Sequence, residues 1–140
     1  MALNGYLFDT SVPHRLSEKV VADAVERYGL DRVLYRCGVV DLEVLRSSTS
    51  KQHHQRLRDM LDGGFADLPI TPEVIDIALT TQRKLVEVGK HRGVSLPDLI
   101  IAACAEVHGA TVVHYDCDYD RIAEVTGQAT EWVVPADSVD

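Results

Sequence analysis

Short runs of apolar residues alternate along this chain with longer segments in which apolar residues recur every three or four positions. The short runs predict strands, and the longer segments predict helices with one apolar face. The expected strands are residues 6–8, 32–37, 65–70, 110–114 and 130–134. The expected helices are residues 13–28, 39–47, 51–61, 71–92, 95–108 and 119–126. Glycines at 29, 63, 64 and 109 follow three of these helices as expected stop signals.

This alternation predicts a mainly parallel sheet with helices on both faces, which is a three-layer α/β/α sandwich. No internal repeat, low-complexity tract or linker interrupts the pattern, so we expect one domain over residues 1–140. In such sheets the functional crevice lies beyond the carboxyl ends of the strands. Asp9 follows the first expected strand and Asp116 follows the fourth. Both are therefore expected at that crevice.

The composition matches that of ordinary globular proteins, with 46% hydrophobic and 26% charged residues among 140. No apolar run approaches the ~18 residues of a membrane span, and the N-terminus lacks the basic region and long apolar stretch of a signal peptide. We therefore expect a cytoplasmic protein without a membrane partner. The three cysteines have no CxxC spacing, which argues against both a disulfide framework and a thiolate zinc site.

The formal net charge of −8 is unevenly distributed. From Gly93 onward the chain has nine acidic residues and one basic residue, Arg121. The total argues at first against a nucleic-acid partner. The separation of charge nevertheless allows a basic surface beside an acidic pocket.

The segment TVVHYDCDYDRI places three carboxylates directly after an apolar run, at Asp116, Asp118 and Asp120. Two unit charges 4 Å apart repel by ~1 kcal/mol in water and by several-fold more in a partly dry cleft. A divalent cation removes this conflict, and Mg²⁺ and Mn²⁺ prefer carboxylate oxygen. The acids therefore predict a site for a hard cation.

Each acid also has a purely structural interpretation. Asp9 can cap a helix or stabilise a turn, and Glu43 can lie on the surface of its helix. Asp98 can form a capping box with Ser95, because the two are three residues apart at an expected helix start. Asp118 can begin the next helix as a first-turn acid. The pattern alone leaves these alternatives open.

Four segments together resemble the successive motifs of a known family. They are Y-L-F-D-T-S at 6–11, V-V-D-L-E-V-L at 39–45, P-D-L-I-I-A-A-C-A-E-V-H-G at 97–109 and V-V-H-Y-D-C-D-Y-D-R-I at 112–122. Their order and spacing are similar to those of PIN domains over nearly the whole chain. They are most similar to VapC, the toxin of bacterial VapBC toxin–antitoxin pairs.

The resemblance implies a metal-dependent endoribonuclease toxin of a type II toxin–antitoxin system that uses Mg²⁺ or Mn²⁺. The implied catalytic and metal-binding acids are Asp9, Glu43, Asp98 and Asp116, with Asp118 as a possible fifth ligand. Ser11 matches the hydroxyl residue that supports the acids in the family. One departure is His114, which stands where many members have Thr or Ser. It leaves the hydrogen bond at that position open.

The resemblance also implies partners. These are an RNA substrate, with transfer RNA and ribosomal RNA both open, a VapB-type antitoxin whose C-terminal segment lies across the active groove, and a second copy in a homodimer. Arg46 and Lys51 belong to the densest basic segment and are expected to contact RNA phosphates. The alternative for these two residues is a solvated helix face.

Two other functions compete with this interpretation. Asp116-Cys117-Asp118 resembles the DxD motif of haloacid-dehalogenase-like phosphatases. Those enzymes place the motif early and need a downstream Lys, whereas no Lys follows Lys90 here. The second alternative is a catalytically inactive PIN-like module that binds RNA or a protein.

Overall fold

A single five-stranded sheet forms the centre of the molecule. The computed structural model describes residues 5–140. The strands are β1 (Tyr6–Phe8), β2 (Leu34–Arg36), β3 (Ala66–Asp67), β4 (Thr111–His114) and β5 (Thr130–Trp132). Their order in the sheet is β3-β2-β1-β4-β5, and every neighbouring pair is parallel.

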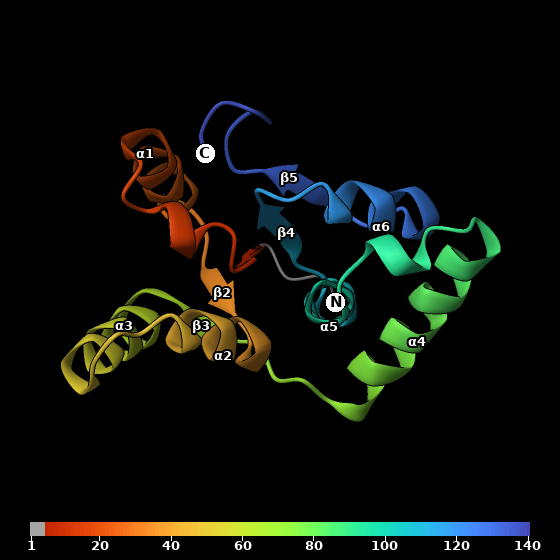
Figure 1. Ribbon diagram of the computed structural model, residues 1–140, viewed down its shortest axis with the longest axis horizontal. Helices are drawn as coiled ribbons and strands as arrows, with labels where there is room; N and C mark the ends of the chain where they lie inside the picture. Colours follow the sequence, from red (N-terminus) through yellow and green to blue (C-terminus); the bar gives the residue numbers. More distant parts are fainter. Residues whose placement is uncertain (1–4) are drawn as a thin grey trace.

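Helices connect these strands, as parallel pairing requires. They are η1 (Pro13–Arg15), α1 (Lys19–Tyr28), α2 (Gly38–Arg46), α3 (Lys51–Gly64), α4 (Pro72–Glu87), η2 (His91–Gly93), α5 (Leu96–His108) and α6 (Asp118–Thr126). Figure 1 shows their arrangement around the sheet. Within the described part of the chain, every helix is too short or too polar to span a bilayer.

The side chains of β1 and β4 point alternately into two apolar cores, because successive strand residues face opposite sides of a sheet. Leu7 and Val112 belong to a core that includes buried residues of α2, α4 and α5. Phe8 and Val113 belong to a second core, which includes Val21 of α1. The sheet is therefore covered on both faces. This confirms the predicted three-layer α/β/α architecture with a parallel sheet (Figure 1).

Three helix boundaries differ from the predictions. The expected helix over residues 13–28 is divided, because Glu18 has an extended backbone (φ −78°, ψ 120°) between η1 and α1. Helix α3 continues through Gly63 and Gly64, where we expected it to stop. Its last turn contains the fully buried Leu61, so tertiary packing outweighs the roughly 1 kcal/mol helix cost of each glycine. Helix α4 ends before Gly89, whose φ of 71° leaves the right-handed helical region.

The carboxyl ends of β1 and β4 lie side by side in the middle of the sheet. These two strands are paired, although β2, β3, five α-helices and two 3-10 helices separate them in sequence. From β1 the chain adds β2 and β3 on one side, and it later adds β4 and β5 on the other side of β1. The strand order therefore reverses between β1 and β4. Such a switch point opens a crevice between the loops that leave the two strands.

Candidate active site

A cleft of about 280 Å³ lies at this switch point. It is lined by Asp9, Thr10, Ser11, His14, Arg15, Glu43, Ser95, Asp98, Asp116 and Asp118. All five acids named from the sequence line it, together with Ser11. These acids come from four separate segments, so the fold brings them together rather than their spacing in the chain.

Asp9 is held at the end of β1 and is almost entirely buried, with 2% of its surface exposed. Its backbone N–H donates to the carbonyl of Val113 on β4 over 2.9 Å. Its Oδ2 accepts from the backbone N–H of Ser11 at 2.9 Å, which is the turn contact expected of an aspartate here. Its Oδ1 accepts from the hydroxyl of Tyr119 at 2.5 Å.

Glu43 enters the cleft from helix α2, which starts where β2 ends. The hydroxyl of Thr10 donates to Glu43 Oε1 over 2.8 Å, so the residue after Asp9 holds the second acid. Glu43 is half-buried. The structure thus places Glu43 along the cleft.

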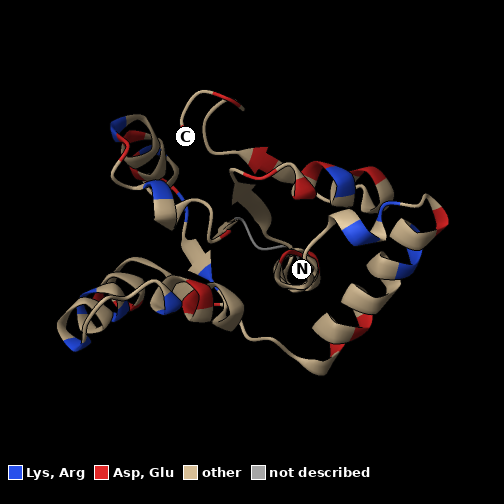
Figure 2. Cartoon of the chain, in the orientation of Figure 1, with Lys and Arg blue, Asp and Glu red and all other residues tan. Residues whose placement is uncertain are grey.

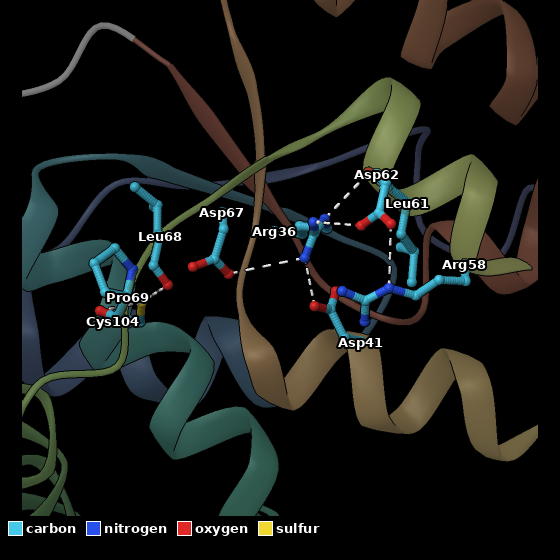
Figure 3. A network of polar contacts seen from close by, with 9 residues as sticks. All are labelled: Arg36, Asp41, Arg58, Leu61, Asp62, Asp67, Leu68, Pro69 and Cys104. Atoms are coloured by element: carbon cyan, nitrogen blue, oxygen red, sulfur yellow. Dashed lines mark hydrogen bonds and ion pairs between the residues drawn. The ribbon is translucent and has the colours of Figure 1, made fainter.

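A buried arginine fixes α2 against its neighbours (Figure 3). Arg36, at the end of β2, is 8% exposed and forms an ion pair with Asp41 of α2. It also donates to the carbonyl of Leu61 over 3.1 Å and to Asp62 Oδ1 over 3.0 Å, both in α3. Asp41 and Glu43 belong to the same helix, so this network joins the helix that carries the second acid to β2 and α3.

Asp98 occupies the first turn of α5 and is 7% exposed. Its backbone N–H donates to Ser95 Oγ over 3.3 Å, as a capping box requires. The reciprocal bond differs from the sequence-based alternative, because the backbone N–H of Ser95 donates to Asp118 Oδ2, over 3.2 Å. Asp118 thus completes the cap, and the carboxyl of Asp98 is left to face the cleft.

Asp116 and Asp118 form a short acidic turn after β4. The backbone N–H of Asp118 donates to Asp116 Oδ1 over 2.9 Å, and Arg121 donates to Asp118 Oδ1 over 2.8 Å. One oxygen of each acid and the Cys117 sulfur lie within 4.8 Å of one another. The exposed thiol is a soft ligand, so for a hard cation the two carboxylates are the useful groups.

His114 replaces the expected hydroxyl residue with a buried ring. Its Nδ1 accepts from the backbone N–H of Asp116 over 3.2 Å. The ring stacks on Tyr119 with centroids 4.8 Å apart. Burial lowers its pKa from 6.5 to about 4, so the ring is neutral at physiological pH. His114 therefore makes a hydrogen bond at this position although it has no hydroxyl group.

Sequence reasoning missed two residues that organise the acids, Thr10 and Tyr119. The Tyr119 hydroxyl lies 2.5 Å from Asp9 Oδ1 and 3.2 Å from Asp98 Oδ1. Tyr119 has one hydroxyl proton to donate, so the pair of contacts is best satisfied when Asp98 is itself protonated. The only signal in the sequence was the position of Tyr119 between two aspartates.

The electrostatics of the cleft favour a bound cation. Burial and the nearby charges of Asp9, Asp116 and Asp118 raise the pKa of Asp98 to about 8. Burial also raises the pKa of Asp116. Carboxylates crowded in this way must either keep a proton or gain positive charge. Five convergent carboxylates, of which two are almost fully buried, fit a hard divalent ion such as Mg²⁺ or Mn²⁺.

Arg46 and Lys51 lie outside this cleft. Both are exposed, Arg46 at the end of α2 and Lys51 at the start of α3. Lys51 lines a separate open hollow with neighbours between Ser48 and Gln55. Figure 2 shows further Lys and Arg along α3 and α4. Their role in binding a substrate stays a prediction.

Comparison with known proteins places this arrangement in context. The model of the family described as PIN domain matches residues 6–125. Ribonuclease VapC51 of Mycobacterium tuberculosis (strain ATCC 25618 / H37Rv) is 44% identical over 140 residues, which is 100% of both chains. Ribonuclease VapC21 of the same strain is 42% identical over 133 residues, covering 92% of this chain and 94% of the relative.

Solved structures agree with the fold. The DNA-bound VapBC of Salmonella typhimurium contains a chain that superposes with a TM-score of 0.76 at 15% identity. That match covers 96% of this chain and 100% of the other. A chain of VapBC2 from Rickettsia felis, bound to a DNA fragment from the promoter, gives a TM-score of 0.75 at 16% identity, covering 91% and 98%.

Proposed function

The chain belongs to the PIN-domain family and, within it, to the VapC proteins, and from that premise we propose that it is a metal-dependent endoribonuclease toxin. The observation that carries the proposal is the meeting of Asp9, Glu43, Asp98, Asp116 and Asp118 in one cleft. A catalytically inactive relative would have little reason to keep five repelling carboxylates and the hydrogen bonds that orient them.

We assign the metal to these five carboxylates, with Asp9, Glu43, Asp98 and Asp116 as the core set. When bound, Mg²⁺ or Mn²⁺ supplies positive charge that stabilises the transition state of phosphodiester hydrolysis and makes water more acidic. The five acids provide a charge that selects a cation, and their oxygens suit a hard one. Asp118 has a second task, since it also caps α5.

The other residues of the cleft hold the acids in place. Thr10 binds Glu43, and Tyr119 binds Asp9 and Asp98. The hydroxyl of Ser11 accepts from the backbone N–H of Tyr115 over 2.8 Å, which ties the loop after β1 to the segment that carries Asp116. These hydrogen bonds matter because metal affinity and catalysis both depend on the orientation of the side chains that bind the metal.

RNA is the proposed substrate because the relatives that match along this chain are named ribonucleases. Transfer RNA and ribosomal RNA both remain candidates. We propose Arg46 and Lys51 as phosphate contacts, since their exposed positive charges lie on the helix that carries Glu43 and on the next helix. Phosphate contacts of this kind make affinity depend on salt.

A VapB-type antitoxin is the proposed protein partner, because the matching solved chains come from VapBC complexes. Exposed apolar side chains on and after α1 offer surface for a partner: Val20 is 52% exposed, Leu30 78% and Val33 52%. Homodimerisation and a cytoplasmic location belong to the same proposal.

The direct test compares two Asp→Asn variants with equal charge change. Asp116 lines the cleft, whereas Asp120 lies four residues later, is exposed and accepts from Trp132 Nε1 at 3.2 Å. We expect Asp116→Asn to reduce Mg²⁺- or Mn²⁺-dependent RNA cleavage by at least about a hundredfold, because a metal ligand is lost. Asp120→Asn should retain near-normal cleavage.

The substrate is identified by mapping cleaved 5′ ends across total cellular RNA after brief induction of each protein. New ends should appear with the wild-type chain and with Asp120→Asn, and be absent with Asp116→Asn. Near-normal, metal-dependent cleavage by Asp116→Asn would reject the assignment of the site. A wild-type protein that binds Mn²⁺ yet cuts no RNA would reject the proposed activity.

A further inference from the structure

The acidic cleft contains one arginine. Among the ten described residues that line it, Arg15 supplies the only guanidinium, and His14 beside it is exposed. Arg15 ends the 3-10 helix η1, six residues after Asp9. The sequence pattern predicts a longer helix over residues 13–28 and gives Arg15 no role. Its place at the rim of a cleft built from carboxylates calls for an explanation.

Three contacts fix this guanidinium. Its Nη1 donates to the carbonyl of Ser11 over 2.8 Å, and its Nε donates to the backbone oxygen of Asp140 over 2.9 Å. The guanidinium carbon also lies 4.7 Å from the centre of the Tyr115 ring, which is a cation–π distance. Arg15 is half-buried as a result.

The C-terminal residues are themselves attached to Tyr115. The Tyr115 hydroxyl donates to the carbonyl of Val139 over 2.8 Å and accepts from the Val139 N–H at 3.0 Å. Figure 1 shows the last segment returning from β5 to lie beside α1. The C-terminal segment, the Tyr115 ring and the loop after β1 thus form one clamp around Arg15.

No side-chain carboxylate is among the three contacts of Arg15, which are the Ser11 carbonyl, the main-chain oxygen of Asp140 and the Tyr115 ring. None of the ion pairs within residues 5–140 includes Arg15, although five acids line the same cleft. Arg121 contrasts with it, because that arginine is paired with Asp118 at 2.8 Å.

The guanidinium also keeps donors available. Arginine has five N–H groups, and two of them are used by Ser11 and Asp140. The three others suit the oxygens of a phosphate, which the planar guanidinium recognises in a bidentate manner. The clamp holds a long side chain in one place, so less conformational entropy is lost when an anion binds.

We propose that Arg15 binds a phosphate group of the RNA strand beside the metal site, and that Tyr115 and the C-terminal residues position it for that role. This inference rests on the proposed ribonuclease function. Arg15 then supplies a positive charge that binds the RNA. Without it, a bound metal ion alone would have to offset the negative charge of the acids. The C-terminal segment becomes part of the active site by holding Arg15.

The test measures binding of a fluorescein-labelled single-stranded RNA by anisotropy with Mn²⁺ present. All variants are made in the Asp116→Asn background, so that the RNA stays intact. Arg15→Gln should weaken binding about tenfold, as expected for loss of a charge-assisted hydrogen bond. It should also reduce the slope of log affinity against log salt by about 0.7, the value for one phosphate on a single strand.

Arg32→Gln is the matched control. Arg32 is exposed and lies 5.6 Å from the ring centre of Tyr6, so the variant removes the same charge and the same kind of aromatic contact outside the cleft. It should leave both affinity and salt slope unchanged. Arg15→Lys should retain the salt slope, because the charge remains, while losing part of the affinity. Tyr115→Leu should weaken binding and retain the slope.

Two results would overturn the inference. One is an Arg15→Gln variant with unchanged RNA affinity and salt slope. The other is equal loss in Arg15→Gln and Arg15→Lys together with a lowered Tm and an unchanged slope, which would mark Arg15 as an anchor of the C-terminal segment only. Cleavage by the wild-type chain is measured in parallel. If it cleaves RNA while Arg15→Gln binds normally, the inference fails and the proposed function stands.

Discussion

Tyr119 places a neutral hydrogen-bond donor between two carboxylates of the cleft. The ring is fully buried and stacks on His114, while its hydroxyl reaches Asp9 and Asp98. Burial and these two acids raise the pKa of Tyr119 well above its usual value, so it acts as a donor and not as a base. At the residue scale, its task is to orient the acids.

Removing this hydroxyl tests that task. We expect Tyr119→Phe to keep the fold, since the ring remains, and to weaken Mn²⁺ binding by roughly tenfold, as is typical when a group that orients metal ligands is lost. Isothermal titration with Mn²⁺ provides the measurement. Tyr28→Phe removes a comparable bond, to Glu131 over 3.2 Å, away from the cleft. Equal Mn²⁺ affinity in the two variants would contradict the orienting role.

The sequence allowed the acids to be named but not all of their tasks. Asp9 and Asp116 followed from their position after apolar strands. The residue pattern alone gives both Asp98 and Asp118 a second interpretation at the start of a helix, so it does not decide which of them caps a helix and which faces the cleft. In the structure Asp118 caps α5 and Asp98 faces the cleft, which depends on the start of α6 lying against the start of α5. No local spacing predicts such a contact.

At the scale of elements, a buried arginine joins β2 and α3 to α2, the helix that carries Glu43. Arg36 meets Asp41, Asp62 and, at 3.8 Å, Asp67 (Figure 3). Burial raises the pKa of Asp41 even with Arg36 beside it. A buried charge of this kind depends on its partner, since an unpaired carboxylate in the interior is costly.

Arg36→Met should therefore lower the free energy of unfolding by about 3 kcal/mol, the lower end of the range for breaking a buried pair. Arg58→Met is the control, because Arg58 forms a half-exposed pair with Asp62 and such pairs contribute about 0–1 kcal/mol. Urea denaturation measures both. The double variant Arg36→Met, Asp41→Leu should recover much of the loss. An equal loss of unfolding free energy in Arg36→Met and Arg58→Met would contradict a larger contribution from the buried arginine.

Most elements were predictable, because their apolar periodicity is strong. The errors fall where distant contacts decide. Helix α3 passes through two glycines because Leu61 is buried and the Phe65 N–H bonds to its carbonyl over 3.1 Å. The division between η1 and α1 was not visible either. It places Arg15 at the rim of the cleft and not on the face of a continuous helix.

At the scale of the whole molecule, the cleft links folding stability to pH. The pKa of Asp98 is raised from 3.8 to about 8, so the native state keeps a proton that the unfolded chain releases above pH 4. Raising the pH between about 4 and 8 therefore destabilises the metal-free protein. His114 acts in the opposite direction below pH 6.5, because its pKa is lowered to about 4 and the unfolded chain gains the proton first.

Below pH 6.5 the effects of Asp98 and His114 on folding stability oppose each other, and above pH 6.5 only Asp98 of the two changes the stability. We expect the Tm of the metal-free protein to fall between pH 6.5 and 8. Saturating Mn²⁺ should abolish this fall, because the cation favours ionised carboxylates. Asp98→Asn should remove most of the pH dependence without metal. A metal-free wild-type protein with the same Tm at both pH values would contradict this account of the cleft.

Anomalous diffraction from crystals grown with Mn²⁺ tests most directly whether the carboxylates from four segments hold a hard cation. We expect an anomalous peak in the cleft, with ligands among Asp9, Glu43, Asp98, Asp116 and Asp118. A fully occupied Mn²⁺ site elsewhere, with this cleft empty and its acids pointing apart, would contradict it.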